Sequence, residues 1–210
     1  MENFTFDTIL DNLKNKVDFS YSRFGDGEMA AILGKTGRNT DGHEYFPDLG
    51  IALKEILESR PSYYLGLQNL GKTQNQNNPE FTRLVEMNKW VDNELIHHAN
   101  IQGRLPELFE ATKDRYVILV GNETLRKIPF KYDDFVDIPM KNCWLDYERV
   151  LQELDDLRGP QCVILYCASM MSNVLTHQLH NLLITQIDIG SALDVWVGRK
   201  TRTYHKNMNL

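Results

Sequence analysis

The chain has 210 residues, 42% hydrophobic and 25% charged, which is typical of a globular protein with a sizeable core. Its formal net charge of −6 argues against general binding to nucleic acids or anionic membranes. No apolar run approaches the roughly 20 residues of a membrane-spanning helix, and residues 1–19 lack the apolar core of a signal peptide. Three scattered cysteines predict buried thiols in a cytoplasmic protein rather than a disulfide framework.

The first half of the chain alternates between strand-like and helix-like patterns of apolar residues. The elements expected there are, in chain order, a strand at 19–24, a helix at 27–35, a helix at 46–59, a strand at 62–67 and a long amphipathic helix at 79–100. The polar stretch 71–79 is expected to form a loop, either an ordinary solvated one or a mobile lid over a site.

The second half continues this alternation and adds two continuous apolar runs, which are typical of strands buried on both faces of a parallel sheet. The elements expected there are a strand at 116–121, a strand at 135–139, a helix at 144–157, a strand at 162–168, a helix at 172–183 and a strand at 185–190. The sequence therefore predicts a single α/β domain over residues 1–210: a doubly wound, mostly parallel, Rossmann-like sheet with helices on both faces.

Polar loops follow four of these strands, at residues 25–28, 122–127, 169–173 and 191–194. Ligands of open α/β sheets bind outside the carboxyl ends of the strands, where such loops converge. Loops that open helices also expose N–H groups that suit an anion. We therefore expect the ligand site at this edge of the sheet.

Two carboxylates, Asp26 and Glu28, stand two residues apart in the first of these loops, each after a glycine and behind Arg23. One interpretation is helix capping, with Asp26 as N-cap and Glu28 in the first turn, worth roughly 1–2 kcal/mol. The other is a metal site, in which glycines with positive φ let the carboxylates converge. Mg²⁺ and Mn²⁺ take such oxygens together with phosphate and water, and Arg23 would add a planar fork for phosphate.

The C-terminal segment carries positive charge within an otherwise acidic chain. Arg199, Arg202 and His205 lie there, and residues 195–210 contain no acid. One interpretation is a basic tail that merely solubilises the protein. The other is that the tail folds over the sheet edge and binds a diphosphate or a nucleic-acid backbone.

The motif SRFGDGE at residues 22–28 resembles the GT-D-type glycosyltransferases, first catalogued as a domain of unknown function in bacterial glycoprotein gene clusters. The segments similar to this family are 20–33, 116–123, 162–179 and 185–194. The resemblance implies a Rossmann-like, nucleotide-sugar-dependent transferase. It also implies that Asp26 and Glu28 coordinate Mn²⁺ or Mg²⁺ at the diphosphate of the donor, usually a UDP-sugar. The C-terminal sequence is more similar to a subgroup of bacteriophage and environmental sequences than to the glycoprotein-modifying members, which leaves the acceptor open.

We therefore expect a hexosyl- or pentosyltransferase that moves a sugar to a hydroxyl acceptor on a glycan, glycopeptide or small molecule. A transferase acting on hydroxylated bases of phage DNA would fit the basic tail and bind in a salt-sensitive way. A non-catalytic module that binds a nucleotide or a partner would need the carboxylates only as helix caps. A metal-dependent phosphohydrolase would release phosphate or a nucleoside monophosphate instead. A homodimer is compatible with the sequence.

The candidate site residues come from the strand ends, the polar loops and the basic tail. The candidate catalytic acids and bases are Asp188, Asp194 and Glu123. The candidate residues for binding the donor are Arg23, Gly25, Gly27, Ser169, Asn173, Gly190, Ser191, Arg199, Arg202 and His205.

Overall fold

The structure, a computed structural model, describes residues 4–68 and 77–208. Within these ranges seven strands form one sheet in the order β3-β2-β1-β7-β6-β4-β5. Every neighbouring pair is parallel, which confirms the predicted parallel α/β sheet. In the described part of the chain, no helix combines the length and hydrophobicity needed to cross a bilayer.

The described residues form strands, α-helices and 3₁₀ helices. The strands are β1 Ser20–Phe24, β2 Tyr64–Leu67, β3 Trp90–Asp92, β4 Val117–Gly121, β5 Asp134–Asp137, β6 Val163–Tyr166 and β7 Thr185–Asp188. The α-helices are α1 Phe6–Lys14, α2 Asp26–Ile32, α3 Pro47–Ser59, α4 Pro79–Met87, α5 Leu95–Ile101, α6 Leu105–Ala111, α7 Tyr147–Leu157 and α8 Met171–Leu179. The 3₁₀ helices are η2 Glu123–Lys127, η3 Cys143–Asp146, η4 Asp194–Val197 and η5 Tyr204–Asn207.

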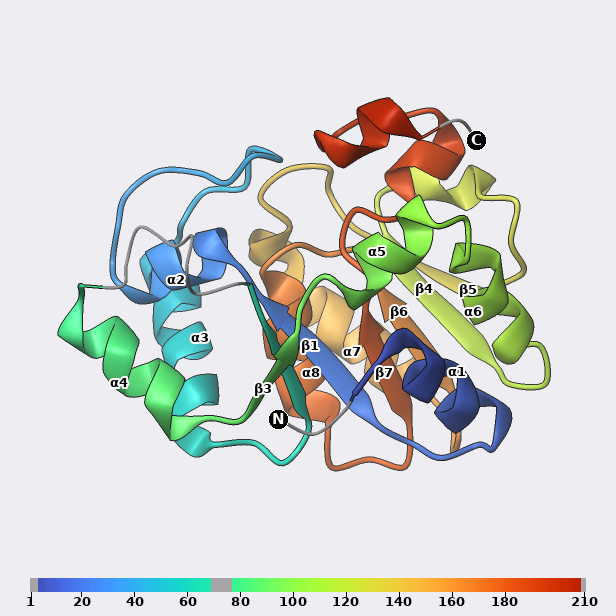
Figure 1. Cartoon of the computed structure of the whole chain (residues 1–210), viewed down its shortest axis with the longest axis horizontal. Coiled ribbons are helices and arrows are strands. Elements are labelled where there is room, and N and C mark those ends of the chain that lie inside the picture. Colours follow the sequence, from blue (N-terminus) through green and yellow to red (C-terminus); the bar gives the residue numbers. More distant parts are fainter. Residues whose placement is uncertain (1–3, 69–76, 209–210) are drawn as a thin grey trace.

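Helices cover both faces of the sheet, as the alternating sequence pattern predicts: α1, α5 and α6 on one face, α7 and α8 on the other (Figure 1). Successive side chains of a strand point to opposite faces. In β4, Val117 and Leu119 accordingly join the core under α1 and α6, whereas Ile118 and Val120 join the core under α7 and α8. All four are buried, so the apolar run does mark a strand enclosed on both sides.

The predicted long helix over residues 79–100 is wrong, because the structure divides this segment into α4, β3 and α5. Asn88 ends α4 in an extended conformation, and its amide donates to the carbonyl oxygens of Leu84 and Leu57. The next residues then pair in parallel with β2 and extend the sheet. A strand of three residues is too short to show the alternation of apolar and polar residues that is typical of strands. The helical pattern on either side of β3 therefore led to the prediction of one continuous helix.

The polar stretch predicted as a loop or lid, residues 71–79, lies largely outside the described residues. Only its last three residues are described, and there Asn78 caps α4 by accepting the N–H groups of Glu80 and Phe81 (2.9 and 3.2 Å). The lid itself stays a prediction.

A buried ion pair joins the strands at their amino ends, and its loss should destabilise the fold. The guanidinium of Arg115, whose side chain is 2% exposed, pairs with Asp18. Asp18 also accepts a hydrogen bond from Thr185 (3.0 Å). We expect Asp18→Ala to lower the free energy of unfolding by about 3 kcal/mol, because it leaves a buried charge without its partner. Urea titration beside the exposed-site control Asp11→Ala measures this. Equal stability of the two variants would contradict it.

Candidate functional site

A cavity of about 1100 Å³ opens at the carboxyl edge of the sheet. Its wall includes residues that follow β1, β4, β6 and β7, namely Gly25, Asn122, Ser169 and Gly190. The strands β1 and β7, which come from opposite ends of the chain, lie side by side at the centre of the sheet, and open α/β sheets bind ligands outside the carboxyl ends of their strands. The convergence of the four polar loops that the sequence predicts is therefore present in the structure.

Most of the predicted site residues line this cavity. They are Arg23, Gly25, Asp26, Gly27, Glu28, Ser169, Asp188, Gly190, Ser191, Asp194, Arg199 and Arg202.

Glu123, Asn173 and His205 lie outside the cavity wall. Glu123 is exposed on η2. Asn173 is buried on α8, where its Oδ1 accepts the hydroxyl of Ser22. His205 is buried within the C-terminal segment, where its Nδ1 accepts the N–H of Arg202 (3.2 Å). The side chains of Asn173 and His205 thus make hydrogen bonds inside the protein. The sequence alone does not show whether a polar side chain bonds to a ligand or to the protein itself.

The two carboxylates of the motif sit in the first turn of α2 but have different surroundings. Glu28 lies in the first turn, as the capping interpretation predicts, and its Oε2 caps the helix by accepting the N–H of Gly25 at 2.8 Å. Gly25, and not Asp26, is the N-cap residue. Asp26 is exposed at the cavity, and its Oδ1 accepts the N–H of Gly27 (3.0 Å).

The expected positive φ of Gly25 and Gly27 is not found, since neither glycine adopts it. Gly25 has a φ of −111°. A Cβ atom on Gly25 would stand 3.3 Å from Glu28 Oε2, a tight contact. This glycine therefore makes room for the capping carboxylate instead of turning the chain.

Asp26 and Glu28 suit a divalent cation only as an open site. Among the residues that the structure describes, no three His, Cys, Asp or Glu side chains form a metal-binding group. Mg²⁺ and Mn²⁺ commonly take one or two carboxylates and complete their shell with phosphate and water, which two acids at a large cavity can accommodate. Burial raises the pKa of Glu28, and the nearby charge of Asp26 raises it further. A bound cation would offset both effects.

Arg23 is held rigidly in the cavity wall. Its Nε donates to the carbonyl oxygen of Asn93 (2.7 Å), and its Nη2 lies 3.1 Å from Nε2 of His97. Gly190 has a positive φ of 55°, and a Cβ atom there would stand 2.4 Å from Nη1 of Arg23. Gly190 is thus required for two reasons: its backbone has a positive φ, and the guanidinium of Arg23 approaches it too closely for a side chain.

Two adjacent histidines of α5, His97 and His98, differ in their surroundings, and His98 is exposed. His97 is half-buried and lines the cavity. Burial, reinforced by the charge of Arg23, lowers the pKa of His97 to about 2. The ring is therefore neutral, and the positive charge of this part of the wall resides on Arg23.

Two further acids of the cavity wall, Asp188 and Asp194, differ in how freely their carboxyl groups can exchange a proton. Burial raises the pKa of Asp188 to about 7, against the opposing charge of Arg23. A carboxyl group with this pKa exchanges protons readily at neutral pH. Asp194 instead accepts the hydroxyl of Thr201 and lies 3.4 Å from Nη1 of Arg199. Its carboxylate is engaged in anchoring the C-terminal segment.

The C-terminal segment folds over the sheet edge, as the second interpretation of the basic tail predicts (Figure 1, red). Arg202 donates from Nε to the hydroxyl of Ser191 (3.1 Å) and pairs with Asp41. Arg199 donates to Asn122 Oδ1 at 3.2 Å. The arginines thus line the cavity with part of their charge balanced by internal acids.

Sequence reasoning missed the loop 37–45, which forms another side of the cavity. Asn39 organises it, because its Oδ1 accepts the N–H groups of Asp41 and His43. Its Nδ2 donates to the hydroxyl of Ser169 (2.8 Å), which joins the loop to the end of β6. The only sequence signal is a density of Asn, Asp and Gly that is common to many loops.

The cysteines are free, as predicted, but they are not all buried. Cys143 and Cys162 are buried, whereas Cys167 is half-buried and lines the cavity. The cause is its place directly after β6, where the strand end meets the cavity floor instead of a helix.

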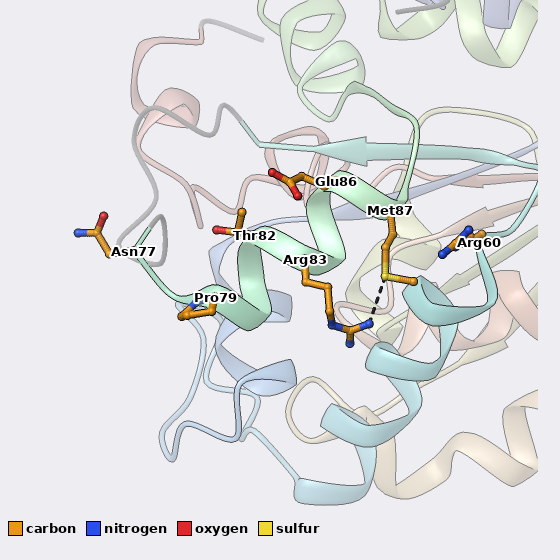
Figure 2. A pocket seen from close by; sticks show the side chains of 7 residues that line it. All are labelled: Arg60, Asn77, Pro79, Thr82, Arg83, Glu86 and Met87. Carbon is orange, nitrogen blue, oxygen red and sulfur yellow. Dashed lines mark hydrogen bonds between the residues drawn. The ribbon is translucent and has the colours of Figure 1, made fainter.

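A second, shallower hollow of about 650 Å³ lies along α4 (Figure 2). The guanidinium of Arg83, which lines this hollow, pairs with Glu58 (2.6 Å) and Glu80 (2.9 Å) and contacts the sulfur of Met87. These contacts hold α4 against α3. The charged side chain in this hollow therefore already has a structural role in packing the two helices.

Neither a protein-family model nor a curated protein matches the sequence. Solved structures do match in fold. A glycosyltransferase (DUF1792) from Streptococcus sanguinis superposes with a TM-score of 0.65 at 19% identity, over 90% of this chain and 81% of that one. Two further structures give a TM-score of 0.64 at 18% identity, over 90% of this chain and 78% of theirs. One is the highly conserved domain of unknown function 1792, described as having a distinct glycosyltransferase fold; the other is a selenomethionine-substituted structure of DUF1792. This chain therefore has the α/β fold of these proteins.

Proposed function

We propose that this protein is a metal-dependent glycosyltransferase. It transfers a sugar from a nucleotide-diphosphate sugar, with a UDP-sugar as the expected donor, to a hydroxyl group of a glycan, glycopeptide or small molecule. The observation that carries this proposal is the convergence of Asp26, Glu28 and Arg23 on one large cavity at the carboxyl edge of the sheet. The shared fold with glycosyltransferases supports it.

The cavity residues have distinct roles in this reaction. Asp26 and Glu28 would hold Mn²⁺ or Mg²⁺, which supplies positive charge to the departing diphosphate. Arg23, fixed by Asn93 and the backbone of Gly190, would bind the same diphosphate with its guanidinium.

Asp188 is the proposed general base, because its pKa of about 7 suits proton exchange at neutral pH. As the acceptor oxygen bonds to the anomeric carbon, the bond from that carbon to the diphosphate oxygen breaks. The hydroxyl proton passes to the carboxylate of Asp188, and the nucleoside diphosphate leaves with the bonding electrons. This role applies to direct attack that inverts the anomeric centre.

A small or glycan acceptor is favoured over DNA by the pairing of the C-terminal arginines. Arg202 pairs with Asp41, and Arg199 lies near Asp194, which leaves less of their charge for a phosphate backbone. A DNA acceptor would instead show binding that weakens steeply with salt.

Thermal-shift and turnover assays with UDP-, GDP-, ADP- and TDP-sugars in Mn²⁺ test the proposal. We expect one nucleotide sugar to raise the melting temperature and to release its nucleoside diphosphate slowly with water as acceptor, both reversed by a chelator. Release of phosphate or nucleoside monophosphate would indicate a phosphohydrolase. Stabilisation without turnover in the presence of hydroxyl acceptors would indicate a binding module, and no response to any nucleotide sugar would contradict the proposal.

A further inference from the structure

Asn93 lines the cavity and carries a buried hydrogen-bond acceptor without a partner among the described residues. It follows β3 directly, lines the cavity, and is only 5% exposed. Its backbone carbonyl accepts Nε of Arg23 at 2.7 Å, and its Nδ2 donates to the carbonyl oxygen of Phe24 at 3.2 Å. Within the part of the chain that the structure describes, its Oδ1 has no hydrogen-bond partner.

The contacts of Asn93 fix the direction of its amide. Turning the amide over would set its oxygen against the carbonyl oxygen of Phe24, two acceptors without a proton between them. Its backbone is also held close to β2, since a Cβ atom on Gly66 would stand 2.9 Å from Cα of Asn93. The unpaired Oδ1 is thus an acceptor held in place before any ligand arrives.

Buried polar atoms in native proteins nearly always have a partner, so an exception in a cavity wall calls for one from a ligand. The amide oxygen needs a donor. A diphosphate at neutral pH offers only acceptors, and the neighbouring guanidinium of Arg23 disfavours a cationic donor. A neutral hydroxyl group satisfies both conditions.

We propose that Asn93 Oδ1 accepts a hydrogen bond from a hydroxyl group on one of the two sugar rings that flank the donor's diphosphate. The inference rests on the proposed function, in which Arg23 binds that diphosphate. Because Arg23 is hydrogen-bonded to the backbone carbonyl of Asn93, a sugar ring next to the diphosphate is the part of the donor within reach of Oδ1. Asn93 is then a specificity-determining residue, since a site built to pair a hydroxyl rejects an analogue that lacks it.

Calorimetric titration in Mn²⁺ tests this with UDP, the preferred UDP-sugar, and analogues of both lacking one ring hydroxyl at a time. The wild type should bind one analogue about tenfold more weakly than its parent ligand. Asn93→Ala should bind that analogue and its parent equally. If an analogue of UDP binds more weakly than UDP, the recognised hydroxyl lies on the ribose. If only analogues of the UDP-sugar bind more weakly than their parent, the hydroxyl lies on the transferred sugar.

The ratio of the affinities for the analogue and for its parent ligand separates the loss of hydroxyl recognition from general damage to the fold. Asn88→Ala is the matched control, because Asn88 lies just before β3 and its amide donates to the carbonyl oxygens of Leu57 and Leu84. It should lower stability and keep the wild-type ratio. Should Asn93→Ala fold poorly, Asn93→Ser provides the same comparison. An unchanged ratio in the Asn93 variants overturns the inference alone, whereas a wild type that binds no nucleotide sugar overturns the proposed function with it.

Discussion

Asp26→Asn is expected to lower metal-dependent turnover about 100-fold or more while the melting temperature changes little. A bound cation contributes several kcal/mol to a reaction that releases a diphosphate, and each 1.36 kcal/mol is tenfold in rate. Asparagine keeps the oxygen that accepts the N–H of Gly27 (3.0 Å) and loses only the charge. The lost charge at the first turn of α2 costs only about 0.3–1 kcal/mol of stability.

Two substitutions of Glu28 separate its charge from its cap. Glutamine still offers an oxygen to the N–H of Gly25, so Glu28→Gln should lose turnover and keep its melting temperature. Glu28→Ala should lose turnover and also about 1 kcal/mol of stability with the cap. Asp114→Asn, an exposed change of the same charge just before β4, is the control. Wild-type turnover in both Asp26→Asn and Glu28→Gln would leave these acids with a helix-stabilising role alone.

Gly50→Ala is expected to destabilise the protein by about 2 kcal/mol, although alanine usually stabilises a helix by about 1 kcal/mol relative to glycine. Gly50 lies in α3, and a Cβ atom there would stand 2.3 Å from the carbonyl oxygen of Ala31 in α2. The clash is with backbone, so α2 itself must move. Because α2 carries Asp26 and Glu28, turnover should fall together with the free energy of unfolding measured in urea.

Gly159→Ala is the matched control for this prediction. A Cβ atom on Gly159 meets nothing within 4 Å, and this glycine has no positive φ. Its stability should equal or slightly exceed that of the wild type. If Gly50→Ala proved as stable as Gly159→Ala, the contact between α2 and α3 would be looser than the structure indicates.

The fold was predictable where local patterns were long and strong. Continuous apolar runs marked β4 and β6, and the alternation of helices and strands indicated a parallel sheet covered on both faces. The failure at residues 79–100 has a physical cause. Trp90–Asp92 is extended because β2 offers it a hydrogen-bonding edge, and that edge is formed by residues distant in sequence.

The candidate site divides in the same way. Asp26, Glu28 and Arg23 were recognisable because they share one short motif. Asn93 and His97 were not, because each becomes a site residue only through Arg23, which lies 70 or more positions earlier in the chain.

The sequence by itself determined the class of most of the elements, the parallel α/β fold and the pair of carboxylates at the start of α2. These follow from periodicity and spacing, which act over a few residues. Only the tertiary structure decided that β1 lies beside β7, which sets Arg23 against Gly190 and near Asp188. It also decided that Glu28 caps α2 and that Asn93 lines the cavity with its Oδ1 unpaired among the described residues. Strand order and burial depend on how the whole chain packs, and no local pattern encodes them.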